Sequence, residues 1–213
     1  MILNTLFSDP MMFIAWFCAI IIALTIHEFS HALTAYLLGD HTAKSMGRVT
    51  LNPLAHISGM GLIMLILVGF GWGKPVPFNP YNFRRIKLDA VLVALAGPFS
   101  NLVVALVAGV TLRALVFQGV LMPENLLIQF LNILIIINSV LMIFNLIPIP
   151  PLDGSKLLFA FLQNSRYSHL ATVLENQGPF ILIALLILDN VAHINIFGGI
   201  FTWMIDMVYR LVF

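Results

Sequence analysis

The chain has 213 residues, of which 61% are hydrophobic and only 9% charged, and its mean hydropathy is +1.03. A soluble domain is about half apolar and about a quarter charged, so this composition excludes the ordinary soluble classes and indicates a polytopic membrane protein. The net charge of +1 argues against a nucleic-acid partner, and the lone cysteine, Cys18, excludes an internal disulfide framework.

The first half of the chain predicts one span followed by a shorter excursion into the membrane. The apolar run of residues 11–38 is long enough to cross about 30 Å of hydrocarbon. Residues 39–56 are polar, and their centre "RVTL" predicts a short strand. Residues 57–73 are apolar but short and interrupted by glycines, which favours a re-entrant segment. Residues 74–87 hold three prolines and four cations and predict an extended edge near the lipid headgroups.

The second half predicts further spans. Residues 88–117 and 126–147 form two strong apolar runs, whereas residues 155–178 are polar and expected at the interface. The last apolar stretch, 179–213, is either one span with a short helix or two tight spans. We therefore expect an all-α polytopic bundle of about four to six transmembrane helices, with a short membrane-associated β element and the re-entrant segment after the first helix.

Cations in two loops orient the chain. The positive-inside rule places both loops in the cytoplasm, so the segment between them enters and leaves on one side. The stretch "HEFSH" lies about eight residues before the end of the first span, or roughly 12 Å below the cytoplasmic surface. "PPLDG" ends the third span on the same side, so two distant segments bring polar groups to similar depth. The loop cations are Lys44, Arg48, Lys74, Arg84, Arg85 and Lys87.

"HEFSH" has the spacing of a metallopeptidase helix. His27 and His31 are four residues apart, so they project from one helix face and are able to bind one zinc ion. Glu28 is rotated by about 100° and suits a general base that accepts a proton from water at the metal. The alternative is that both histidines are buried and bond to backbone, with Glu28 as a structural partner. It is disfavoured because an acidic residue in a span costs on the order of 3 kcal/mol and is functional by default.

A catalytic zinc site needs a third protein ligand and an open position for water. Asp153 is the best candidate, because it follows an apolar span in a proline-rich turn and precedes Gly154. Irregular backbone at membrane depth is tolerated only where it is buried in protein or lines a wet cavity. Taken alone, Asp153 would equally suit the N-cap of a helix that begins with "GSKLLFAFL".

Two motifs together resemble those of the site-2 protease family of intramembrane zinc metalloproteases. "HEFSH" matches the family's H-E-x-x-H, and "NLIPIPPLDG" matches its N-x-x-P-x-x-x-L-D-G. "GPFSN", residues 97–101, resembles the family's G-x-x-x-[N/S/G] motif on the intervening helix. The resemblance covers residues 11–160, and the short chain looks like the minimal bacterial and archaeal type, which lacks PDZ and CBS domains.

The resemblance implies a mechanism and a setting. His27, His31 and Asp153 would hold one Zn²⁺, Glu28 would be the general base toward a zinc-activated water, and Asn145 would lie near the substrate backbone or the developing oxyanion. The expected enzyme is a single transmembrane peptidase domain over residues 1–213, with C-terminal helices in 179–213. It would cleave a peptide bond within or near a transmembrane segment of a membrane-protein substrate. We expect it in a bacterial or archaeal cell membrane, in contact with the lipid bilayer, with the site toward the cytoplasm.

Weaker features and competing functions stay open at this point. Gly97 and Asn101 suit close helix packing, with a supporting hydrogen bond from Asn101 to the site as the alternative. His56 suits an interfacial histidine, with a supporting role at the site as the alternative. A metal transporter would use the same ligands for transit but needs several polar sites along a path. A non-catalytic module that binds membrane proteins would not need Glu28.

Overall fold

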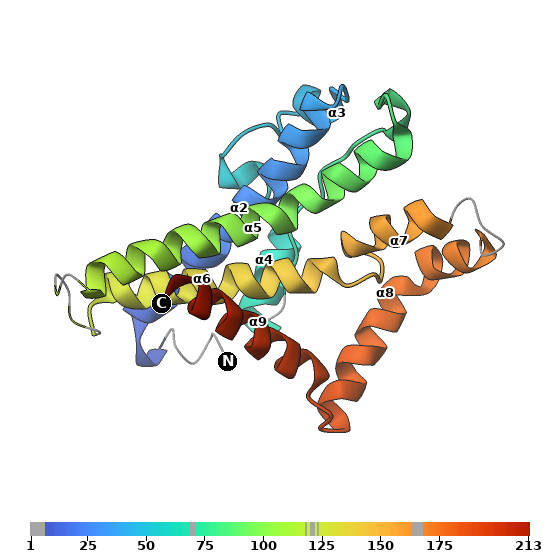
Figure 1. The fold of residues 1–213 in the computed structure, drawn as a ribbon. Helices are drawn as coiled ribbons and strands as arrows, with labels where there is room; N and C mark the ends of the chain where they lie inside the picture. Colours follow the sequence, from blue (N-terminus) through green and yellow to red (C-terminus); the bar gives the residue numbers. More distant parts are fainter. Residues whose placement is uncertain (1–6, 69–70, 118, 120–121, 123, 163–167) are drawn as a thin grey trace.

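The computed structural model describes residues 7–68, 71–117, 119, 122, 124–162 and 168–213. Among these residues, four helices are long and apolar enough to cross a membrane, as expected for an integral membrane protein. The fold is all-α, with three long helices side by side and the remaining helices around them (Figure 1). In chain order the α-helices are α2 (Pro10–Leu37), α3 (Thr42–Ser45), α4 (Gly59–Val68), α5 (Ile86–Phe117), α6 (Leu126–Leu146), α7 (Gly154–Leu162), α8 (Ser168–Val191) and α9 (Ile196–Val212).

The helices α2, α5 and α6 pack against one another and form the centre of the molecule. Their predicted spans are confirmed within two residues at each end. At 1.5 Å per residue, the 28 residues of α2 and the 32 of α5 extend about 42 Å and about 48 Å, so both exceed a perpendicular crossing of about 30 Å. Asp9 caps α2 by accepting a hydrogen bond from the Met12 amide, and Gly39, at φ +105°, ends it.

Small side chains at four-residue intervals allow these helices to approach closely. Without a hydrophobic force between helices in lipid, packing relies on small residues that bring backbones together and on polar groups that bond across the interface. Both kinds lie in the same buried stripe on each helix, so the site residues continue the packing surface. The stripe on α2 is Ala15, Ala19, Ala23, His27, His31 and Ala35; on α5 it is Asp89, Val93, Gly97, Asn101, Ala105 and Gly109.

The segment 57–73 returns to its starting point. Ile57 and Gly73 form an isolated antiparallel bridge, and between them α4 has only ten residues, so the ends of the excursion meet as a re-entrant segment requires. The predicted strand "RVTL" is wrong. Residues 48–51 form a bend flanked by irregular backbone, and this bridge is the one β pairing in the described part of the chain. The Arg48 amide donates to the Ala43 carbonyl, and the Thr50 carbonyl accepts from His56 Nε2. The backbone of this segment therefore bonds without a partner strand.

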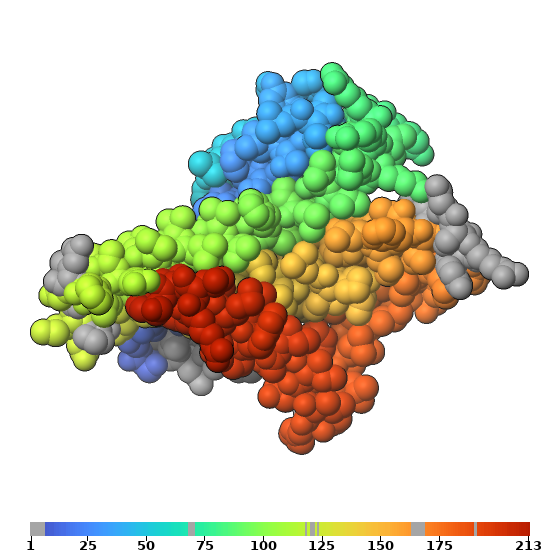
Figure 2. Space-filling model, in the orientation of Figure 1, coloured from blue at the N-terminus to red at the C-terminus, as the bar shows by residue number. Residues whose placement is uncertain are grey.

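The C-terminal third holds three helices among its described residues. Residues 155–178, expected to be polar and interfacial, contribute most of α7 and the first half of α8. The last apolar stretch gives one candidate span in α8 and a second, shorter helix α9 of 17 residues, which packs along α6 and α5. In Figure 2, α8 (orange) reaches away from the body of the molecule, while α9 (red) lies against α5 and α6.

Candidate metal centre

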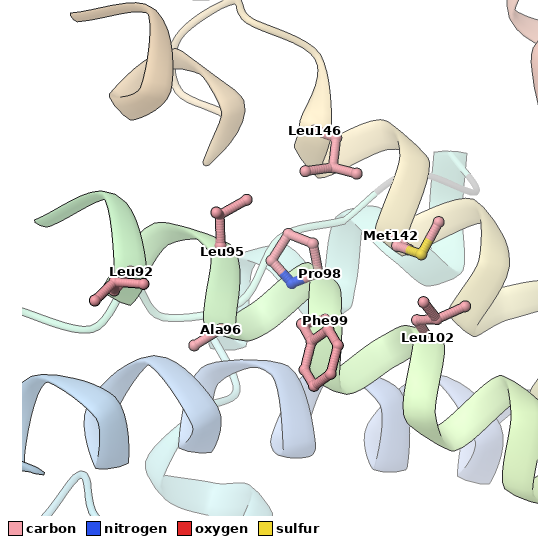
Figure 3. Close-up of a pocket in the computed structure, with 8 residues that line it drawn as sticks. All are labelled: Leu92, Leu95, Ala96, Pro98, Phe99, Leu102, Met142 and Leu146. Carbon is pink, nitrogen blue, oxygen red and sulfur yellow. The ribbon is translucent and has the colours of Figure 1, made fainter. Parts of the chain in front are cut away.

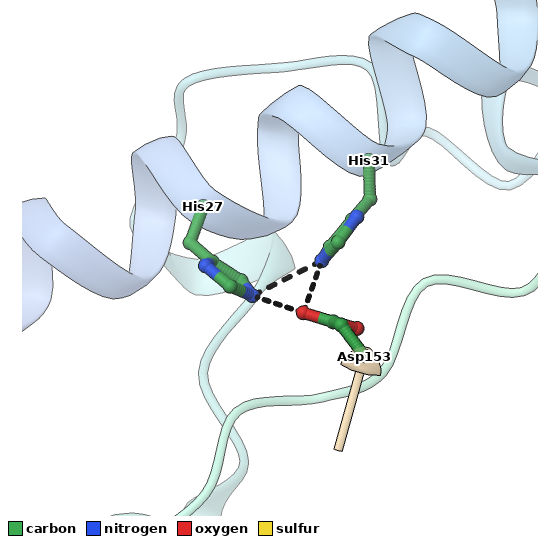
Figure 4. Close-up of side chains that lie close together, drawn as sticks. All are labelled: His27, His31 and Asp153. Carbon is green, nitrogen blue, oxygen red and sulfur yellow. Dashed lines mark hydrogen bonds and ion pairs between the residues drawn. The ribbon is translucent and has the colours of Figure 1, made fainter. Parts of the chain in front are cut away.

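Three side chains from two distant segments converge on one point. His27 and His31 project from one face of α2, and Asp153 approaches them from the turn after α6 (Figure 4). Each imidazole Nε2 lies 3.2 Å from Asp153 Oδ2, and the two Nε2 atoms are 3.0 Å apart. Their side chains are 5%, 9% and 23% exposed, respectively for His27, His31 and Asp153, so the cluster is mostly shielded from solvent.

Two close approaches bring the ligands together. A Cβ on Gly97 of α5 would lie 2.6 Å from His27 Cε1 and closer still to His31 Nε2, so only glycine lets α5 sit against both imidazoles. On the other side, a Cβ on Gly154 would lie 2.6 Å from the Ile147 carbonyl oxygen. The chain therefore folds back tightly on the end of α6, which carries Asp153 toward α2.

Hydrogen bonds fix the orientation of both imidazoles. His31 Nδ1 lies 2.7 Å from the Val93 carbonyl, which can only accept, so Nδ1 carries the proton. His27 Nδ1 lies 2.6 Å from Asn101 Oδ1, and the Asn101 amide donates to Asn138 Oδ1 at 2.8 Å. Both rings thus present the unprotonated Nε2 toward Asp153, as metal-binding histidines do.

The geometry and the chemistry of the donors fit a zinc ion. Two nitrogen lone pairs and a carboxylate oxygen at 3.0–3.2 Å repel one another unless a cation lies between them. Tetrahedral zinc with bonds of 2.0–2.2 Å separates its ligand atoms by roughly 3.3–3.6 Å, close to these distances. Asp153 Oδ2 is buried and has no hydrogen-bond partner, so its lone pairs are free for a metal.

The Asp153 side chain points to the histidines, not to a helix end. The carboxylate faces the histidines rather than the start of α7, where the backbone bond runs from the Lys156 amide to the Asp153 carbonyl. Its side chain therefore does not act as the N-cap that the sequence alone allowed.

Asn138 on α6 was not singled out in the sequence. It is fully buried, accepts from Asn101 and donates to the Leu134 carbonyl at 2.8 Å. A chain of hydrogen bonds therefore runs from His27 through two amides to the backbone of a third helix. The signal that would have found it is an amide in the middle of an apolar span, which is costly unless it bonds to another polar group.

Glu28 lies beside the metal-binding trio rather than within it. It is half-buried, and a Cβ on Gly73 would lie 3.3 Å from its Oε1, so the carboxylate rests against the returning end of the 57–73 segment. It interacts electrostatically with His31 and with Arg48. This position agrees with its rotation around α2 and leaves its oxygens near the metal cluster without joining it.

Asn145 and His56 make other contacts. The half-buried Asn145 amide donates to the Leu141 carbonyl of its own helix at 3.0 Å, two residues before the turn that carries Asp153. His56 is fully buried, its Nε2 donates to the Thr50 carbonyl at 2.8 Å, and its own carbonyl accepts from the Lys74 amide. His56 thus joins the loop of residues 39–56 to Lys74, which follows the glycine that contacts Glu28.

A separate apolar groove of about 430 Å³ lies between α5 and α6 (Figure 3). Its lining includes the residues on both sides of Gly97, Ala96 and Pro98, so one turn of α5 faces the histidines with one side and the groove with another. None of its side chains is a metal ligand, and this groove is therefore distinct from the metal centre. Its lining is Leu92, Leu95, Ala96, Pro98, Phe99, Leu102, Met142 and Leu146.

Comparisons with known proteins indicate the family of the chain. The profile of peptidase family M50 matches residues 115–188. Rip2 of Mycobacterium tuberculosis (strain H37Rv), provisionally named a zinc metalloprotease, is 30% identical over 194 residues, which are 88% of this chain and 71% of that protein. Rip2 of Mycolicibacterium smegmatis, named in the same way, is 29% identical over 216 residues, 94% of this chain and 75% of that protein.

A third relative is more similar over a shorter region. YwhC of Bacillus subtilis (strain 168), also provisionally named a zinc metalloprotease, is 43% identical over 142 residues. The alignment spans 65% of this chain and 65% of the length of YwhC. No solved protein structure matches the chain. The chain belongs to peptidase family M50, the site-2 protease family of zinc metalloproteases.

Proposed function

We propose that this protein hydrolyses a peptide bond within or near a transmembrane segment of a membrane-protein substrate. The observation that carries the proposal is the convergence of His27, His31 and Asp153 inside a bundle of apolar helices, with Glu28 beside them. Three ligands and a nearby carboxylate form the set that metal-assisted hydrolysis requires. A site so enclosed by membrane-type helices is suited to substrates that lie in the membrane themselves.

In this mechanism His27, His31 and Asp153 hold the metal. Asn101 and the Val93 carbonyl keep both imidazoles in the tautomer that leaves Nε2 free. A bound zinc ion would supply Lewis-acid chemistry toward the scissile carbonyl and the attacking water. Glu28 would accept a proton from that water and pass it to the leaving amine.

The substrate backbone must be unwound before it reaches the site, because a helix engages each carbonyl in a hydrogen bond. Residues 74–79, which form neither helix nor strand, offer a partner for such a segment through main-chain pairing. Asn145, at the end of α6, is the polar side chain that we propose for contact with the substrate backbone. For this it would exchange its bond to the Leu141 carbonyl for one to the substrate.

We further propose that the site faces the cytoplasm of a bacterial or archaeal cell. The cations of residues 39–56 and 74–87 flank the end of α2 that carries the histidines, and the positive-inside rule places such loops in the cytoplasm. Water and released product would therefore exchange on that side. Reaction of cysteines introduced at Lys44 and at Phe117 with a membrane-impermeant reagent tests the orientation, because the two positions should label from opposite faces.

The deciding experiment is Glu28→Gln in the zinc-loaded protein, assayed with a single-span test substrate in liposomes. Gln keeps the size of the side chain but cannot accept the proton, so we expect turnover to fall by about 10²–10⁴-fold with zinc content unchanged. Glu175→Gln on α8 is the matched control, because Glu175 is exposed and lies on a helix that contributes no residue to the site. Undiminished turnover in Glu28→Gln would contradict the proposal, and zinc flux without cleavage would favour a transporter.

A further inference from the structure

The loop around Glu28 contains a buried cation whose position the fold alone does not explain. Arg48 is 3% exposed, and its guanidinium donates to the Lys74 carbonyl and, at 3.1 Å, to the Pro75 carbonyl. No carboxylate of the described residues lies within ion-pair distance of it, and its Nε is buried without a hydrogen-bond partner. A buried charge paired only with neutral carbonyls costs several kcal/mol, so a purely structural purpose would be served better by a neutral amide.

The carbonyls that Arg48 holds belong to the segment that contacts Glu28. Residues 73–82, here called the strap, begin at Gly73, against which the Glu28 carboxylate rests. The next two residues, Lys74 and Pro75, accept from Arg48. The Lys74 amide also donates to the His56 carbonyl at 2.6 Å, which closes the re-entrant segment at the same place. Glu28 and Arg48 therefore meet adjacent residues of one short piece of backbone.

The charge of Arg48 is close enough to Glu28 to act on its carboxylate. The guanidinium interacts electrostatically with Glu28, the acidic group that the proposed mechanism uses beside the metal. A carboxylate next to a zinc ion tends to become a ligand itself, because oxygen donors bind zinc well. Attraction toward the fixed Arg48 guanidinium, through a low-dielectric region, competes with that movement.

We propose that Arg48 is a positioning residue that holds the strap against Glu28 and keeps the Glu28 carboxylate beside the metal, out of its ligand set. This inference rests on the proposed function for its kinetic consequence. Its structural part, the place of Glu28 relative to the metal, is measurable without turnover.

The strap has a second anchor that provides a matched control. Asp40 is fully buried and accepts from the Asn79 amide at 2.7 Å and from the Asn82 side chain at 2.7 Å, so it fastens the far end of the strap. Asp40→Asn should loosen the strap without removing the charge that faces Glu28. If Arg48 only stabilised the loop, Arg48→Gln and Asp40→Asn would lower kcat to a similar extent.

The experiment compares Arg48→Gln, Arg48→Lys and Asp40→Asn as full-length, zinc-loaded proteins on a single-span substrate. For Arg48→Gln we expect kcat to fall about 10–100-fold, beyond any rise in KM from the loosened strap, with zinc content unchanged. Arg48→Lys should recover part of the loss because it keeps the charge but loses the fork that binds two carbonyls. Asp40→Asn should keep kcat within about threefold. Equal losses in Arg48→Gln and Asp40→Asn, or wild-type kcat in Arg48→Gln, would overturn the proposal.

Two measurements separate this inference from the proposed function. X-ray absorption at the zinc edge should report an additional oxygen ligand in Arg48→Gln but not in Arg48→Lys, even if no substrate is cleaved by wild type. Amide hydrogen exchange should rise at Lys74 in Arg48→Gln and near Asn79 in Asp40→Asn. An unchanged zinc environment in Arg48→Gln would overturn the positioning role whatever the activity.

A further pair of variants applies if Arg48→Gln does not fold. Gly73→Ala places a methyl group 3.3 Å from Glu28 Oε1 and so disturbs the same contact while Arg48 stays intact. Gly59→Ala is its control, because a Cβ there meets nothing within 4 Å. We expect Gly73→Ala to lower kcat about threefold to tenfold and Gly59→Ala to leave it unchanged, and equal kcat in the two variants would contradict the inference.

Discussion

The helices α6 and α8 are both candidate spans, yet they hold very different places in the molecule. Half of the most apolar window of α6 is buried inside the protein, compared with 17% of that of α8. α6 packs between α2, α5 and α9, whereas α8 meets only α7 and α9 among the described elements (Figure 1). Apolarity is required of both by lipid, so it does not tell a packed helix from an exposed one.

The distinction lies in small and polar residues. α6 carries Asn138 within a hydrogen-bond network that reaches the site, and α5 meets α2 through Gly97. α8 has one comparable close approach, at Gly178, where a Cβ would lie 2.6 Å from Pro150. We expect the central helices α2, α5 and α6 to carry the metal site and the C-terminal pair, α8 and α9, only to support it. Matched substitutions in the two regions should then differ in their effect on metal binding.

The largest difference is expected between two glycines of α5. Gly97→Ala drives a methyl group into both imidazoles, so we expect zinc affinity to fall about 100-fold or more and activity to be lost. Gly109→Ala meets Val212 of α9 at 2.6 Å instead, and it should lower stability while zinc binding is retained. Titration with a zinc chelator measures both, and equal zinc affinity in the two variants would break the comparison.

A smaller difference should separate two asparagines of α6. Asn138→Ala removes the partner that orients Asn101 and through it His27, so zinc affinity should fall about tenfold. Asn132 accepts from Tyr209 of α9 at 2.6 Å, so Asn132→Ala should loosen α9 and leave zinc affinity unchanged. A loss of zinc affinity in Asn132→Ala as great as in Asn138→Ala would show that the two ends of α6 are not independent.

The loop next to the site should respond to acid. Burial raises the pKa of the Asp40 carboxyl, but four hydrogen bonds from Thr42, Asn79 and Asn82 outweigh it and hold the pKa below its usual range. Its stabilising contribution is therefore complete above the unfolded-state pKa of about 3.9 and is lost as pH falls through the lower folded value. Thermal unfolding at pH 7 and pH 3 should show a smaller acid-induced loss in Asp40→Asn than in wild type, and an equal loss would contradict this.

The smallest effect is expected at the junction of α8 and α9. Asp189 accepts from the Ile196 amide at 2.7 Å and from the Phe197 amide at 3.3 Å, and so caps the start of α9. Asp189→Ala should cost about 1 kcal/mol of stability, seen as a lower Tm in detergent, with zinc content equal to wild type. Zinc loss in this variant would mean that the C-terminal pair is coupled to the metal centre.

Much of this protein was determined by its sequence alone. The spacing of His27, Glu28 and His31 and the turn before Gly154 predicted the zinc metalloprotease family, because metal ligation depends on residue type and helical period. Long apolar runs located the spans, since lipid allows few alternatives to a helix. The strand "RVTL" failed because its backbone bonds to the Ala43 carbonyl and to the His56 side chain, which a local pattern does not report.

Only the tertiary structure decided how the two parts of the site, the histidines of α2 and the turn after α6, meet. Asp153 was equally suited to cap α7, and the fold-back at Gly154 directs its carboxylate to the histidines instead. Asn138 and Arg48 acquired their partners from segments 37 and 26 residues away. The physical reason is that a buried polar group needs a hydrogen-bond partner. Helix packing, rather than the neighbouring residues in the chain, brings that partner to it.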